Sequence, residues 1–158
     1  MDPLRHVKFF ATVKHTGQLY SSLPYTHHLA AVENVLRRFG VSDETLLTAA
    51  WLHDVVEDTN TSLTEVEEMF GSKVAQLVHA VTNENGSNRK TRNLLTYPKI
   101  RAIGTDAIKL KLADRIANVE AGGNLFKMYK KEYGDFRQAL FIEGQNEEMW
   151  HYLDMLLK

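Results

Sequence analysis

Residues 46–59 read LLTAAWLHDVVEDT, and this stretch decides both the fold and the chemistry that we expect. His53 and Glu57 are four residues apart, as are Asp54 and Asp58, so on a helix the four polar side chains project from one side. Burying carboxylates without a partner is costly, and a divalent cation would supply that partner. The other side of the helix offers apolar residues suited to a core: Leu46, Ala49, Ala50, Leu52 and Val56.

Two further stretches place polar residues in apolar helices. Residues 108–120 read IKLKLADRIANVE, in which Asp114 shares a polar line with Lys111 and Asn118. Arg115, which follows Asp114, can form a plain surface ion pair with it, worth little. Residues 24–32 read PYTHHLAAV and put two histidines in the first turn of a helix. A single His-Asp pair is weak support for a metal site, but the three stretches together suit a divalent cation.

Length and composition favour one soluble globular domain spanning residues 1–158. Hydrophobic residues make up 44% of the chain and charged residues 25%, and there is no cysteine. Disulfides and thiolate ligands are therefore excluded, so a metal would need nitrogen and oxygen ligands. The net charge of −1 gives no overall basic field for nucleic acid. We expect no membrane span and no signal peptide, and hence a cytoplasmic protein.

The spacing of apolar residues is helical almost throughout and predicts an all-α bundle of about seven to nine helices. Ser62 and Glu65 form a capping box. Gly134 is expected to interrupt the last third of the chain, with Asp135 capping the helix that follows. The expected helices cover residues 3–15, 24–39, 43–58 with Ser42 as cap, 62–71, 74–81, a stretch ending at 103, 105–120, and two between 125 and 157; loops are expected at 16–23 and 83–92.

The order His…His-Asp…Asp resembles the HD superfamily of metal phosphohydrolases. AAWLHDVVEDT, FGSKVAQLVHAVT and IKLKLADRIANV are similar to the hydrolase domain of RelA/SpoT homologues, and specifically to small alarmone hydrolases. The resemblance covers about residues 10–120. It implies a single-domain HD-type helical bundle. It also implies metal-dependent hydrolysis of the 3′-pyrophosphate of an alarmone nucleotide, (p)ppGpp or (p)ppApp, with release of pyrophosphate.

The resemblance also implies roles for individual residues. PYTHHL resembles the family pattern PYxxHP, with Leu29 in place of the proline, and the resemblance implies that His28 rather than His27 is a metal ligand. Glu57 and Asp58 match the pair that holds and orients the attacking water. The further metal ligands implied are His53, Asp54 and Asp114. The implied substrate contacts are Asn118 near the ribose, Arg89 and Lys90 at the pyrophosphate, Tyr20, and Lys130 and Tyr133 at the nucleotide. The ligand types lean toward Mn²⁺, with Zn²⁺, Fe²⁺ and Mg²⁺ as alternatives.

One departure from the family pattern concerns the base. The arginine expected soon after Gln18, which packs against guanine in guanosine-alarmone hydrolases, is absent, and Leu19 or Tyr20 stands there. Guanine and adenine therefore both remain open, as does the oligomeric state. Two other functions also remain open: an HD-type phosphohydrolase acting on nucleotide 5′-phosphates, and a non-catalytic module that binds a nucleotide or a partner.

Overall fold

The computed structural model describes residues 1–158 and confirms the expected all-α class. Nine α-helices have eight residues or more, and α4 is a single turn. The elements are α1 (Arg5–Lys14), β1 (Leu19–Tyr20), β2 (Leu23–Pro24), α2 (Thr26–Arg38), α3 (Glu44–Leu52), α4 (Val55–Asp58), α5 (Leu63–Phe70), α6 (Ser72–Val81), α7 (Arg89–Ile103), α8 (Thr105–Ala121), the 3₁₀ turn η1 (Gly123–Leu125), α9 (Phe126–Leu140) and α10 (Glu147–Leu156).

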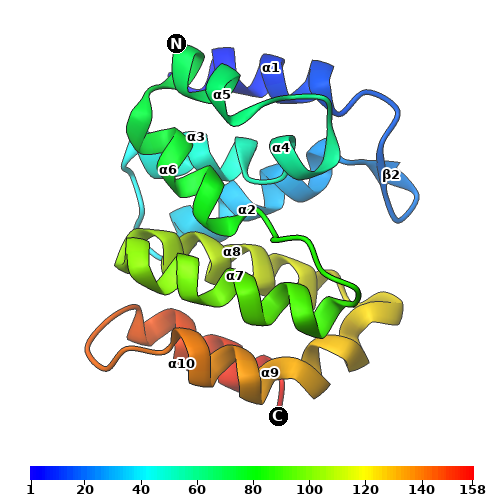
Figure 1. Ribbon diagram of the computed structural model, residues 1–158, viewed down its shortest axis with the longest axis vertical. Helices are drawn as coiled ribbons and strands as arrows, with labels where there is room; N and C mark the ends of the chain where they lie inside the picture. The colour runs from blue at the N-terminus through cyan, green and yellow to red at the C-terminus, as the bar shows by residue number, and fades with distance from the viewer.

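The helices stack in tiers, with α8 running through the middle of the molecule (Figure 1). α1 and α5 lie at the end that holds the N-terminus, and α9 and α10 lie at the end that holds the C-terminus. α8 packs against α2, α3 and α6 on one side and against α7, α9 and α10 on the other. Ten of its 17 residues are buried, including Asp114 and Arg115. None of the helices is both long enough and apolar enough to span a membrane.

The expected single helix over residues 43–58 is wrong. α3 ends at Leu52, and a short α4 begins at Val55. Asp54 lies between them with φ −108° and ψ 2°, outside the ordinary helical region. The start also differs, because the Asp43 carboxylate accepts from Thr45 N at 3.2 Å and replaces Ser42 as the cap. The break changes the directions in which the polar side chains on its two sides project.

Other boundaries differ from expectation for local reasons. Pro24 lies in a small antiparallel hairpin and not in a helix, and α2 begins at Thr26. Gly134 lies within α9, which continues to Leu140 because Phe136 and Leu140 bury their side chains in the core. The interruption falls instead at residues 141–146, so Asp135 caps no helix.

The capping box of α5 is confirmed, whereas the expected loop at 83–92 is too long. Glu65 N donates to Ser62 Oγ at 3.1 Å. α7 begins at Arg89, because the Asn88 side chain caps it by accepting from Thr91 N at 2.8 Å. This helix start fixes the direction of Arg89 beside α8 and α9.

Candidate metal centre

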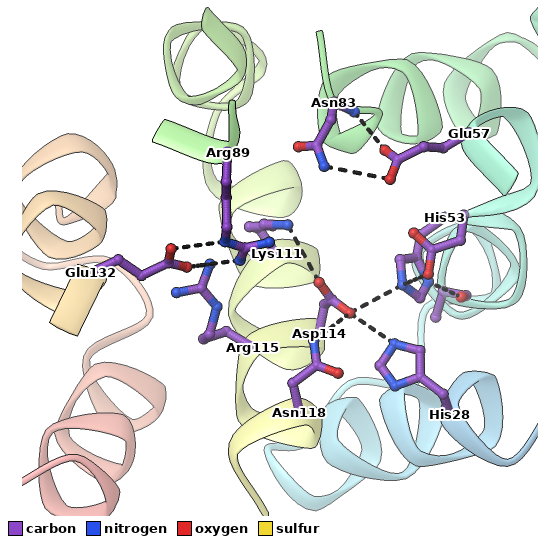
Figure 2. Close-up of polar contacts among 12 residues, drawn as sticks. His28, His53, Glu57, Asn83, Arg89, Lys111, Asp114, Arg115, Asn118 and Glu132 are labelled. Atoms are coloured by element: carbon purple, nitrogen blue, oxygen red, sulfur yellow. Dashed lines mark hydrogen bonds and ion pairs between the residues drawn. The ribbon is translucent and has the colours of Figure 1, made fainter. Parts of the chain in front are cut away.

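Four side chains from three parts of the chain converge at the middle of the molecule. His28 comes from α2, His53 and Asp54 from the break between α3 and α4, and Asp114 from α8. One ligand atom of each lies within 4.8 Å of the others. Asp114 Oδ1 is 2.9 Å from His28 Nε2 and 3.2 Å from His53 Nε2, as Figure 2 shows. These are the four residues that the family resemblance implied as metal ligands.

Neighbouring groups fix the directions of these ligand atoms. His53 Nδ1 donates to Ala50 O at 2.6 Å, which turns Nε2 toward the carboxylates. His53 Nε2 is 3.0 Å from Asp54 Oδ2, and the Tyr25 hydroxyl donates to the same carboxylate oxygen. Such partners determine the orientation of histidine and carboxylate ligands in metal sites.

The charges at this cluster favour a cation. Burial disfavours a charged imidazole, yet the Asp54 and Asp114 carboxylates outweigh it and raise the pKa of His53 well above its ordinary value. Burial would raise the pKa of Asp114, but Lys111 and His53 hold it well below the usual range. The cluster is therefore strongly attractive to positive charge. Two imidazole nitrogens and two carboxylate oxygens form a donor set that fits a divalent ion such as Mn²⁺, Fe²⁺ or Zn²⁺.

Glu57 lines the cavity beside the cluster and is held in place by the segment that follows α6. Its Oε1 accepts from Asn83 N at 2.8 Å, and its Oε2 accepts from Asn83 Nδ2 at a longer 3.4 Å (Figure 2). Burial raises the pKa of Glu57, and the nearby Asp54 carboxylate adds to this effect. A carboxylate with a raised pKa is suited to proton transfer near neutral pH.

Asp58 is held differently. It is outside the lining of the cavity, and its Oδ2 accepts from Gln18 Nε2 at 3.0 Å. Gln18 Oε1 in turn is 2.7 Å from Nδ1 of the buried His15. Burial raises the pKa of Asp58 as well. The structure thus places Asp58 beside the hairpin and outside the cavity that Glu57 lines.

The cavity has a volume of about 280 Å³ and two walls of different character. On the aromatic wall, Tyr20 stacks on His28 with ring centroids 4.7 Å apart, and its hydroxyl donates to Asn118 Oδ1 at 2.7 Å. The cationic wall comes from α7 and α8 and consists of Arg89, Lys111 and Arg115. The cavity therefore joins the candidate metal ligands to a surface that favours an anion.

The structure brings together some of the expected substrate contacts and separates others. Tyr20, Arg89 and Asn118 line the cavity. Lys90 lines a neighbouring cavity of about 290 Å³ between α7 and α9, to which Arg89 also contributes. Lys130 is exposed and lines neither cavity, and the Tyr133 hydroxyl donates to Asp154 on α10. Lys130 and Tyr133 therefore lie away from the candidate site.

Sequence reasoning missed several groups around the cavity. The sequence allows Arg115 a plain surface ion pair with Asp114, but Arg115 is only 1% exposed and pairs with Glu132 on α9. No sequence signal predicts that pair, because it depends on how α9 packs against α8. Tyr25 has a signal, since it lies three residues before His28 and so on the same helical face.

Comparisons with known proteins agree on one family. A family model described as HD domain matches residues 7–132. Guanosine-3′,5′-bis(diphosphate) 3′-pyrophosphohydrolase MESH1 of Drosophila melanogaster is 35% identical over 114 residues, which cover 70% of this chain and 64% of that protein. The bifunctional (p)ppGpp synthase/hydrolase SpoT of Escherichia coli K12 is 37% identical over 129 residues, 77% of this chain and 18% of SpoT.

A solved structure described as a metazoan orthologue of SpoT that hydrolyses ppGpp matches the fold. The TM-score is 0.83 at 29% sequence identity, and the match covers 96% of this chain and 91% of that chain. The chain spans slightly less than two thirds of the length of the animal MESH1 proteins that it matches.

Proposed function

The chain belongs to the HD domain family, and from this membership and the geometry of the cluster we propose that it is a metal-dependent 3′-pyrophosphohydrolase of alarmone nucleotides. The proposed reaction breaks the bond between the ribose 3′-oxygen and phosphorus, adds water to that phosphorus and releases pyrophosphate. The observation that carries the proposal is the convergence of His28, His53, Asp54 and Asp114 at a cavity that three of them line together with Glu57. The names of the relatives support the substrate class.

The four clustered residues would hold the ion. A divalent ion held there supplies a water of lowered pKa and neutralises charge on phosphoryl oxygens. We propose Mn²⁺, because the set has two carboxylates, two imidazoles and no thiolate. His53 keeps Nε2 directed at the site through its Nδ1 bond to Ala50 O, and Tyr25 fixes Asp54. The chain thus presents its ligands already oriented.

We assign proton transfer to Glu57. Its Oε1 is fixed by the 2.8 Å bond from Asn83 N, whereas Oε2 has only the longer contact and is the atom available to accept a proton from water. The same atom can then deliver a proton to the departing 3′-oxygen. We infer that Asp58, held by Gln18, supports this group with its charge. Arg89 and Lys111 would hold phosphoryl oxygens, which carry the negative charge of the reaction.

The aromatic wall would hold the nucleoside. Tyr20 and Asn118 are joined by a 2.7 Å hydrogen bond, which positions both beside the cavity. Leu19 or Tyr20 stands where guanosine-alarmone hydrolases have an arginine, and neither side chain carries a charge. We therefore propose that adenine is accepted as well as guanine.

The test is turnover of ppGpp and ppApp side by side, with added Mn²⁺ and with a chelator. We expect pyrophosphate release from both nucleotides with Mn²⁺ and none with the chelator. Nucleotides that carry only 5′-phosphates serve as the control substrates. Release of orthophosphate from those nucleotides, with no pyrophosphate from either alarmone, would contradict the proposal and favour a 5′-phosphohydrolase.

A further inference from the structure

Arg115 is a buried cation beside the candidate metal centre. It follows Asp114 on α8, and its side chain is 2% exposed. Its guanidinium carbon lies 4.1 Å from the centre of the Phe136 ring and 4.8 Å from that of Tyr129. Its Nη2 is 3.1 Å from Glu132 Oε1. These contacts determine the position of the guanidinium plane.

One nitrogen of this group has no partner. Arg115 Nη1 is buried and donates a hydrogen bond to no protein oxygen, while the side chain lines the 280 Å³ cavity. A charged donor buried without an acceptor is costly, and such groups in native proteins call for a partner. Nη2 pairs with Glu132, and the side chain lines the cavity, so an anion bound in the cavity is the candidate partner for Nη1.

The Glu132 carboxylate that contacts Arg115 is shared with a second arginine, so one negative charge faces two guanidinium charges. Glu132 also accepts two bonds from Arg89, at 2.9 Å from Nε and 2.8 Å from Nη2 (Figure 2). Burial would raise the pKa of Glu132, but the two guanidinium groups outweigh it and hold that pKa below its ordinary value. One carboxylate therefore faces two arginines, and Lys111 lies one turn before Arg115 on the same helix.

We propose that Arg115 binds a phosphate group of the substrate through Nη1, with Glu132 holding the guanidinium in the required position. A guanidinium group in a fixed plane is well matched to phosphate oxygens. The identification of the anion as phosphate rests on the proposed function. The phosphate belongs either to the pyrophosphate that is cleaved or to the 5′ end of the nucleotide, and the two are separated by the experiment below.

The experiment measures binding without turnover, by calorimetry on the full chain loaded with Mn²⁺. GDP and inorganic pyrophosphate are titrated separately into the wild type, Arg115→Gln and Arg115→Lys. Loss of a charge-assisted hydrogen bond predicts that Arg115→Gln weakens at least one of the two ligands about 10-fold or more. Weaker GDP binding alone assigns the 5′ end, and weaker pyrophosphate binding alone assigns the cleaved group.

Arg137→Gln is the matched control. Arg137 also lies 4.1 Å from an aromatic ring, that of Phe141, and its Nε is 3.5 Å from Asp154, but it lines neither cavity. This variant should bind both ligands as the wild type does. Thermal denaturation of every variant reports whether it folds. If Arg115→Gln does not fold, ligand binding is measured on Arg115→Lys instead. This variant keeps the positive charge, so its loss of ligand affinity should be smaller than the loss of about 10-fold expected for Arg115→Gln.

Glu132→Gln separates phosphate binding from a structural role. If Arg115 serves only to pair with Glu132, removing either partner should weaken ligand binding alike. If Arg115 binds phosphate, Glu132→Gln should weaken ligand binding less than Arg115→Gln does, because both guanidinium charges remain and the glutamine oxygen can still accept a hydrogen bond from them. Equal weakening in the two variants, or wild-type affinity for both ligands in Arg115→Gln, overturns the proposal. Failure of the wild type to turn over alarmones would instead contradict the proposed function, since these titrations need no turnover.

Discussion

Replacing Asp114 by asparagine is expected to remove both the bound ion and the catalytic activity. Asp114 Oδ1 is the atom that faces both imidazoles, at 2.9 Å from His28 Nε2 and 3.2 Å from His53 Nε2. Asparagine keeps the shape of the side chain but removes one of the two carboxylate charges of the cluster. Because an ion in such a site contributes several kcal/mol to the reaction, turnover should fall by roughly 1,000-fold or more.

The measurement for Asp114→Asn combines metal content by mass spectrometry with pyrophosphate release. Asp106→Asn is the matched control, because Asp106 lies on the same helix, is exposed and precedes Asp114 by eight residues, which is about 12 Å along the helix axis. The control should retain one ion per chain and full turnover. A variant Asp114→Asn that keeps one equivalent of Mn²⁺ would show that Asp114 is not a ligand.

Replacing Glu57 by glutamine is expected to separate ion binding from catalysis. Glu57 is outside the four-residue cluster but lines its cavity, and its carboxylate is held by Asn83. Glutamine keeps the size of the side chain and cannot take a proton from water at neutral pH. The variant should therefore keep its ion and lose about 10²- to 10⁴-fold in turnover.

Glu67→Gln is the matched control for Glu57→Gln, since Glu67 is an exposed glutamate on the neighbouring α5. Metal content and pyrophosphate release are measured for both variants and the wild type. Wild-type turnover in Glu57→Gln would contradict the proposed role of Glu57 in proton transfer. Loss of the ion in the same variant would show that Glu57 is needed to bind the metal, which is a different role from the proton transfer proposed for it.

The four clustered residues were predictable because each has a local signature. His53 and Asp54 are adjacent, Asp114 lies within an apolar helix, and His28 lies in the first turn of another. Those local patterns, together with the family resemblance, were enough to expect that the residues meet. The all-α class followed from the same source, because helical spacing of apolar residues is visible over most of the chain.

What the sequence did not reveal depends on contacts between elements that are far apart. The break at His53 and Asp54 is invisible to helical spacing, which continues through it. Gly134 suggested an interruption that packing of Phe136 and Leu140 prevents. The sequence offers Arg115 its neighbour Asp114 as a possible surface partner, whereas its partner in the structure, Glu132, is 17 residues away on another helix.

Anomalous diffraction at the manganese edge, from crystals of the full chain loaded with Mn²⁺, tests the metal site most directly. We expect one strong peak, roughly 2 Å from a nitrogen of His28 and of His53 and from a carboxylate oxygen of Asp54 and of Asp114. A peak bound by other residues, or crystals of active protein with no peak at this cluster, would contradict the proposed ligand set and the mechanism built on it.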